Sequence, residues 1–157
     1  MNILLAVDGS APSEEAVREL ASRPWPQPST VRVLYVEPLP MLGAAAYAPP
    51  PMTVASTSLP VAVLDAEREA TERAAAIAAK HAEKLKAIGL ATEFRQRRGD
   101  VSSEIVDEAK EWPADLIVMG SHGRTGLKRL LLGSVAHAVV SRAPCSVEVV
   151  RRESPPE

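Results

Sequence analysis

The sequence is poor in aromatic residues and in cysteine. Phe, Trp and Tyr make up 3% of the 157 residues, whereas hydrophobic residues make up 46%. The core must therefore consist of Val, Leu, Ile and Ala, which suits a parallel sheet covered by helices. The single cysteine, Cys145, cannot form an internal disulfide, and this fits a reducing cytoplasm. A chain of this length is near the usual size of one domain.

The sequence also lacks a long apolar run and an excess of charge. No apolar stretch reaches the roughly 18 residues of a membrane-spanning helix, and Met1 and Asn2 lead directly into the first apolar segment without a signal peptide. The formal net charge is −2 and the pI is near 6.0, so neither nucleic acid nor an anionic membrane is attracted in general. We expect a cytoplasmic protein that binds neither.

Apolar runs and helical patterns alternate along the chain. Such alternation implies βαβ crossovers and a parallel sheet. The predicted strands are 3–7, 31–36, 92–97, 115–119 and 146–150. The predicted helices are one that follows Ser10 and is stopped by Pro24, and those over 64–88, 100–111 and 134–140. Charged residues at 93, 95 and 97 predict that the third strand lies at an edge of the sheet. The long helix carries an apolar stripe made of Leu64, Ala74, Ile77, Ala78, His81, Leu85 and Ile88.

Residues 38–62 do not fit this regular alternation. The stretch from Pro38 to Pro60 contains six prolines, both ends included, a composition that favours a mobile surface loop. The segment also follows the carboxyl end of a predicted strand, where ligands of open α/β sheets bind. A lid over a ligand is therefore the alternative interpretation of this segment.

A glycine motif follows the apolar run 116–119. Gly120 and Gly123 are three residues apart, and Gly133 and Ser134 come after nine further residues. Two glycines alone also mark an ordinary turn, but the third glycine and the strand-loop-helix setting favour a phosphate cradle at a helix N-terminus. The spacing matches neither a P-loop nor the dinucleotide fingerprint.

Other chemistry is less well supported. Ser121, His122 and Asp8 supply the residue types of a hydrolase triad, but Ser121 and His122 are adjacent and lack the nucleophile-elbow pattern. His122, His137 and Cys145 lack the close pairs of a structural zinc site. No catalytic and no metal-ligating residues are therefore predicted.

The motif Gly120-x2-Gly123-x9-Gly133-Ser134 resembles the ATP-binding signature of the universal stress protein family, and residues 3–10 are similar to that family's first strand and turn. The resemblance runs from residue 2 to about 151, with 38–62 matching poorly. It implies one nucleotide-binding domain over 1–151 and a tail over 152–157. The implied fold is a three-layer α/β fold with a five-stranded parallel sheet, strand order 3-2-1-4-5, and helices on both faces.

The resemblance also implies a nucleotide site. Asp8 would lie near the adenosine, a turn or helix cap being the alternative role, and the Val36 backbone would read the adenine edge. Met119 and Gly120 would flank base and ribose, and the second half of the motif would hold the phosphates. The implied contacts are Ala6, Val7, Asp8, Val36, Met119, Gly120, His122, Gly123, Arg124, Gly133, Ser134 and Val135. Arg124, Lys128 and Arg129 are either solvated loop cations or charges near the phosphates.

The implied function is that of a stress-response regulator that holds ATP, with Mg²⁺ bound through the phosphates, and turns it over little. A slow ATPase and a nucleotide-independent adaptor for an unidentified protein partner are the alternatives, and AMP or cyclic AMP are alternative ligands. The resemblance further implies a homodimer through 146–150. Glu148 interrupts the valines of that strand, where it either points to solvent or weakens the pairing.

Overall fold

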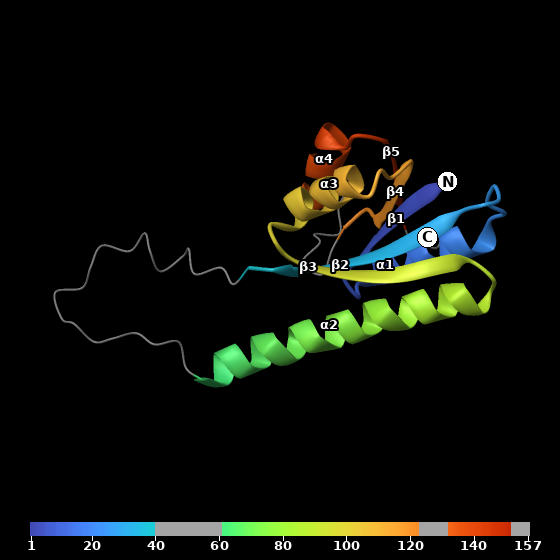
Figure 1. Cartoon of the computed structure of the whole chain (residues 1–157). Helices are drawn as coiled ribbons and strands as arrows, with labels where there is room; N and C mark the ends of the chain where they lie inside the picture. The colour runs from blue at the N-terminus through green and yellow to red at the C-terminus, as the bar shows by residue number, and fades with distance from the viewer. Residues whose placement is uncertain (40–60, 123–131, 152–157) are drawn as a thin grey trace, which may run out of the picture.

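The computed structural model describes residues 1–39, 61–122 and 132–151. Within them the chain forms five parallel strands in the order β3-β2-β1-β4-β5, with helices on both faces (Figure 1). This arrangement confirms the predicted fold. In chain order the elements are β1 (Asn2–Val7), α1 (Ala11–Ser22), β2 (Thr30–Pro38), α2 (Val61–Ala87), β3 (Ala91–Gly99), α3 (Val101–Glu111), β4 (Leu116–Gly120), α4 (Ser134–Arg142) and β5 (Ser146–Val150).

The borders of the predicted insertion need a small correction. Pro38 still belongs to β2 and Val61 already belongs to α2, so the connection is shorter than 38–62. Residues 40–60 lie outside the described residues. The two interpretations of this segment, a lid and a surface loop, therefore concern a part of the chain that the structure does not describe.

Capping residues explain why the helix starts could be predicted. The Ser10 hydroxyl accepts a hydrogen bond from the Ser13 amide at 3.3 Å, which caps α1. Asp100 caps α3 by accepting from the Ser103 amide at 2.9 Å. Hydrogen bonds from the Ser103 hydroxyl, the Ser103 amide and the Ser102 hydroxyl lower the pKa of Asp100, because they favour its charged form. The end of α2 also follows its sequence signal, because Gly89, just after the helix, takes the left-handed conformation with φ +90°.

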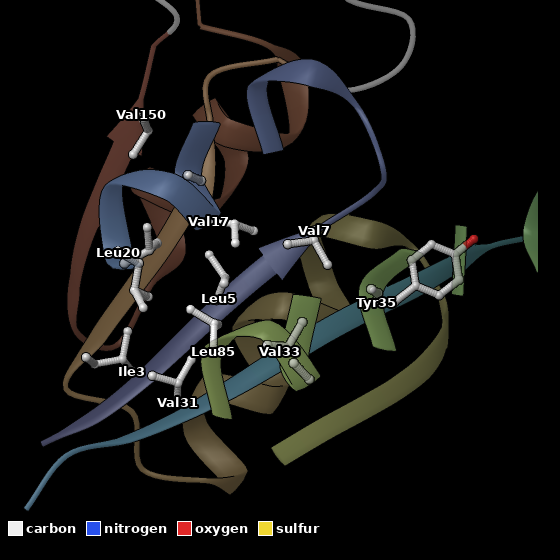
Figure 2. Close-up of a cluster of buried hydrophobic side chains, with 14 of the residues drawn as sticks. Ile3, Leu5, Val7, Val17, Leu20, Val31, Val33, Tyr35, Leu85 and Val150 are labelled. Atoms are coloured by element: carbon white, nitrogen blue, oxygen red, sulfur yellow. The ribbon is translucent and has the colours of Figure 1, made fainter. Parts of the chain in front are cut away.

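The sheet separates two apolar cores. Alternate strand residues such as Leu5 and Val33 face α1 and α2 (Figure 2), whereas Leu4 and Leu34 face α3 and α4. All four side chains are fully buried. The sheet is therefore covered on both faces, as a parallel sheet of Val, Leu and Ile requires.

The apolar stripe of α2 is narrower than predicted. Ala74, Ala78 and Leu85 are buried as expected, but Ile77 is 36% exposed and Ile88 is 57% exposed. Ile88 comes after the last residue of α2. The small alanines at 74, 78 and 82 are buried over the sheet together with Leu85, whereas Ile77 and Ile88 lie at the margin of the contact.

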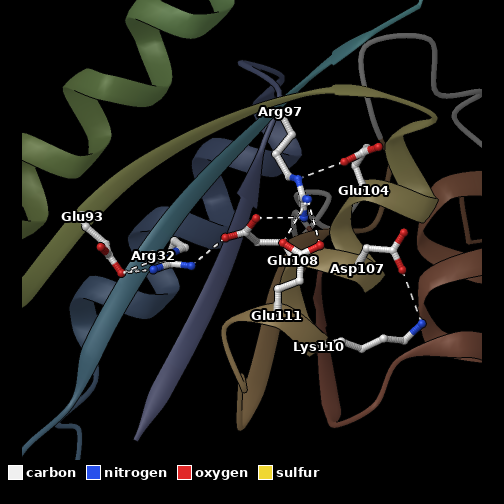
Figure 3. A network of polar contacts seen from close by, with 8 residues as sticks. All are labelled: Arg32, Glu93, Arg97, Glu104, Asp107, Glu108, Lys110 and Glu111. Carbon is white, nitrogen blue, oxygen red and sulfur yellow. Dashed lines mark hydrogen bonds and ion pairs between the residues drawn. The ribbon is translucent and has the colours of Figure 1, made fainter.

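A buried carboxylate organises the opposite face of β2 and β3 (Figure 3). Glu108 of α3 is 2% exposed and forms ion pairs with Arg32 at 2.7 Å and with Arg97 at 3.0 Å. The Arg32 guanidinium also lies over the Trp112 ring, 4.3 Å from its centroid. Arg97 also forms ion pairs with Glu104 and Glu111. β3 is an edge strand as predicted, but its Arg97 is thus paired with residues of α3 and is not simply a solvent-exposed charge.

We predict that Glu108→Gln destabilises the fold. The substitution keeps the side-chain volume but removes the negative charge between two arginines, and we expect a loss of about 2 kcal/mol in the free energy of unfolding. Urea unfolding followed by circular dichroism measures this loss. Glu111→Gln is the matched control, because Glu111 is 61% exposed and exposed pairs contribute little. Equal losses in both variants would contradict a special role for Glu108.

Candidate functional site

The predicted nucleotide-contacting residues of the described chain lie where strands end and where α4 begins. All strands are parallel, so their carboxyl ends share one edge of the sheet. β1 lies between β2 and β4, and the chain direction across the sheet reverses there. Crevices at such a switch point are the usual ligand sites of open α/β sheets.

Asp8 shapes the turn between β1 and α1. Its Oδ1 accepts a hydrogen bond from the Ser10 amide at 3.0 Å, and Gly9 between them has φ +77°, a conformation that favours glycine. The predicted turn role of Asp8 is therefore confirmed, while contact with an adenosine stays a prediction. From α2, Ile77 Cδ1 lies 3.4 Å from the point that a Cβ at Gly9 would occupy.

Gly120 allows α1 to approach the end of β4. A Cβ at this position would lie 2.7 Å from the carbonyl carbon of Pro12 and 2.8 Å from its oxygen. Contacts this short with backbone atoms cannot be relieved by a side-chain movement. The first glycine of the motif therefore has a packing requirement, whatever it contributes to ligand contact.

Ser121 ties three segments together at this edge. Its amide donates to the Val150 carbonyl at 2.8 Å, and its own carbonyl accepts from the Gly133 amide at 2.9 Å. Its hydroxyl lies 3.2 Å from Nδ1 of His122. Ser121 is 4% exposed, so the ends of β4 and β5 and the start of α4 are held together by buried polar contacts.

Gly133 and Ser134 open α4 as predicted. Gly133 is the N-cap residue with φ −58°, and no side chain caps the helix among the described residues. Any residue can adopt this backbone conformation, so glycine is needed here for lack of room and not for its φ angle. A Cβ at 133 would lie 3.1 Å from the Ser121 carbonyl oxygen and 3.3 Å from His122 Cα. Ser134 is exposed and Val135 is half-buried. The first amides of α4 are thus without a side-chain cap, unlike those of α1 and α3.

Four predicted contacts are core residues by their side chains. Ala6, Val7, Val36 and Met119 are each between 5% and 8% exposed. Val7 packs in the core under α1 and α2, and the other three pack under α3 and α4. Any contact from these residues to a ligand would therefore come mainly from their backbone.

The remaining predicted contacts lie outside the described residues. These are Gly123 and Arg124, and the same holds for the loop cations Lys128 and Arg129. Among the described residues, no group of three or more His, Cys, Asp or Glu side chains could hold a metal ion.

Two residues of this edge were missed as site residues in the sequence. Ser121 was considered only as a hydrolase nucleophile, although its place inside the glycine motif was a signal. Pro12 gave no signal, because its contact with Gly120 depends on how α1 packs across the sheet.

Two further properties concern Cys145 and the helices. Burial, followed by the nearby Asp115, raises the pKa of the half-buried Cys145 thiol, which disfavours the reactive thiolate. No helix in the described ranges is long and apolar enough to cross a membrane.

Comparison with known proteins gives matches to one protein family. The model of the Universal stress protein family matches residues 1–151. Universal stress protein YxiE of Bacillus subtilis is 31% identical over 150 residues, which cover 95% of this chain and 97% of YxiE. Universal stress protein MJ0531 of Methanocaldococcus jannaschii is 54% identical over 54 residues, which span 34% of this chain and 32% of that protein.

Solved structures share the fold. The structure of MJ0577, a universal stress protein of Methanocaldococcus jannaschii, superposes with a TM-score of 0.75 at 25% identity. The match covers 98% of this chain and 97% of that one.

Proposed function

Since this chain belongs to the universal stress protein family, we propose that it is a nucleotide-binding regulatory protein that holds ATP at the carboxyl edge of its sheet. The adenosine would lie between the ends of β1 and β2, beside Asp8 and the Val36 backbone. The phosphates would lie at the start of α4. ATP would act as a ligand that shifts the protein between conformations.

One observation carries the proposal. The start of α4 has no side-chain cap in the described chain, so the amides of Ser134 and Val135 in its first turn are the ones proposed to meet the phosphates, whereas the Gly133 amide already donates to the Ser121 carbonyl. Backbone amides at an uncapped helix start attract anions, because the helix dipole adds a partial positive charge. Glycine at position 133 keeps side-chain bulk away from these amides.

Related structures support a nucleotide as the class of ligand. One universal stress protein with this fold was solved in complex with cAMP, and another, from Arabidopsis thaliana, was solved with AMP bound. Both carry an adenine nucleotide. We favour ATP for this chain because its sequence carries all three glycines and the serine of the motif that resembles the family's ATP-binding signature.

Mg²⁺ would arrive with the nucleotide. Since the described residues contain no cluster of metal-ligating side chains, the phosphates themselves would supply the ligands that fix the ion. Mg²⁺ commonly keeps several waters and binds through phosphate oxygens. In the family's expected role the protein would work in the cytoplasm.

We predict that Gly133→Val abolishes binding of MgATP. A β-branched side chain at this position would meet the Ser121 carbonyl oxygen and His122 Cα and occupy the space of the phosphates. Ser134→Ala should cost about 1 kcal/mol, the size of one hydrogen bond. Isothermal titration calorimetry measures both affinities.

Ser141→Ala is the control for the serine substitution. Ser141 lies on the same helix, is exposed and binds the His137 carbonyl, so its loss should leave the affinity unchanged. An unchanged affinity in Gly133→Val would refute the cradle. Circular dichroism establishes that this variant is folded before its affinity is interpreted.

A second prediction is that bound ATP is turned over slowly. Efficient phosphoryl transfer needs a group that orients the attacking water and a fixed metal between the phosphates. In the described part of the site, His122 beside Ser121 is the only group suited to orienting water. We expect steady-state phosphate release far below the roughly 10 s⁻¹ typical of enzymes. A rate near that value, lost in His122→Ala while binding persists, would establish the ATPase alternative instead.

The sheet edge at β5 supports a homodimer. β5 is the outer strand beside β4, and natural proteins usually cover or pair such edges. Glu148 does not leave an uncompensated charge there, because it forms an ion pair with Arg23 of its own chain at 2.9 Å. We propose that two chains pair along Ser146–Val150 while each keeps its own nucleotide site.

Val149→Pro tests this assembly. Proline removes a backbone donor from the strand, and we expect the dimer to become a monomer. Light scattering measures the mass, and circular dichroism establishes that the monomer is folded. A folded variant that remains dimeric would exclude this interface.

A further inference from the structure

His81 is a buried histidine without a polar partner. Its side chain lies on α2 and the residue is 7% exposed. Neither Nδ1 nor Nε2 has a hydrogen-bond partner in the described chain. Buried polar atoms are nearly always paired, so two unpaired ring nitrogens in one core residue need an explanation beyond packing.

The surroundings of His81 favour the neutral ring. Its neighbours along the buried face of α2 are Ala74, Ala78, Ala82 and Leu85, which pack with Ala16, Val17 and Leu20 of α1 in one apolar core. Figure 2 shows Val17 and Leu20 beside Leu85 and the strand residues of this core. A charged imidazolium would have no solvent there, and transferring a charge into such a core is costly.

Charged groups near His81 lie on two helices. Lys84 and Lys80 on α2 disfavour a positive ring, and Glu14 on α1 favours it. The strands under α2 contribute uncharged residues along most of this face, since Thr92, Phe94 and Gln96 of β3 are in register with Val31, Val33 and Tyr35 of β2. At the end of the same strands, Glu37 and Arg98 pair with each other at 3.6 Å. Burial is the largest influence, followed by Lys84, and the pKa of His81 is lowered from 6.5.

The same face of α2 reaches the nucleotide site. Ile77 is one helical turn before His81, so both side chains lie on one side of the helix. Ile77 Cδ1 lies 3.4 Å from the point that a Cβ at Gly9 would occupy, in the turn that Asp8 and Ser10 form. A displacement of α2 at His81 would therefore also move the neighbour of this turn.

We propose that His81 is a pH-sensitive latch between α1 and α2, and that its protonation loosens the Asp8–Ser10 turn and weakens nucleotide binding. This inference rests on the proposed function for its effect on the ligand. The latch itself does not need a ligand, because it is a property of the packing between two helices.

The direction of the pH effect follows from the shift in pKa. The folded state holds the ring neutral at pH values at which the unfolded chain already protonates it. The stability that His81 contributes is therefore present above pH 6.5, the unperturbed value, and is lost progressively as the pH falls below it towards the folded pKa. Acid consequently favours any state in which α2 has moved and the ring reaches water.

His81→Gln is the test variant, because glutamine is polar and does not titrate. His137→Gln is the matched control, since His137 is exposed on α4. Calorimetry with MgATP at about pH 7.5 and about pH 5.5 spans the range in which histidine changes charge. Between these values we expect the affinity of the wild type to fall about fivefold more than that of His81→Gln, a typical coupling between sites. ATP's own titration is the same for all proteins and cancels in this comparison.

Amide hydrogen exchange of the nucleotide-free protein separates the two proposals. At the lower pH we expect residues 8–17 and 74–85 to exchange faster in the wild type and His137→Gln than in His81→Gln. If no protein binds MgATP at either pH, the proposed function fails, and the hydrogen-exchange rates alone test the latch. The latch proposal would be overturned by equal exchange rates in the wild type and His81→Gln, or by an affinity that falls equally in all three proteins. Should His81→Gln not fold, His81→Leu takes its place with the same expectations.

Discussion

The candidate site depends on one steric constraint, the approach of the first turn of α1 to the end of β4. The Pro12 carbonyl lies where a side chain at position 120 would have to be, so only glycine allows the two backbones to meet. The first turn of α1 therefore lies against the end of the neighbouring strand, β4. The Asp8 turn and the Ser121 segment thereby reach the same part of the sheet edge.

A second close approach fixes the other side of the site. The Gly133 amide binds the Ser121 carbonyl, and a side chain at 133 would crowd the same oxygen. Both glycines thus serve contacts between backbones, and neither needs a positive φ. Without a side chain at 133, the first turn of α4, which has no side-chain cap in the described chain, keeps the form of helix starts at which phosphate groups bind.

The two faces of the sheet differ in how firmly they are held. Under α3, Glu108 joins Arg32 and Arg97 in a buried ion network, which fixes β2, β3 and α3 relative to one another. Under α1 and α2 the contacts are apolar, and His81 is the buried polar residue without a hydrogen bond. Apolar contacts are not directional, and in the described part of the chain α2 lacks the ion pairs that hold α3, while its Ile77 lies next to the space above Gly9.

The sequence by itself determined the elements and the place of the glycine motif, while the order of the strands came from the resemblance to the family. These properties depend on local signals: apolar periodicity, the caps at Ser10 and Asp100, and the stop at Gly89. Only the tertiary structure decided that Arg97 pairs inward, that Ile77 lies at the margin beside Gly9, and that Ser121 joins three segments. These contacts join residues of different elements, and the Arg32–Glu108 pair of the same network spans 76 positions. Local patterns cannot specify such partners, because the partner is chosen by how helices and strands pack.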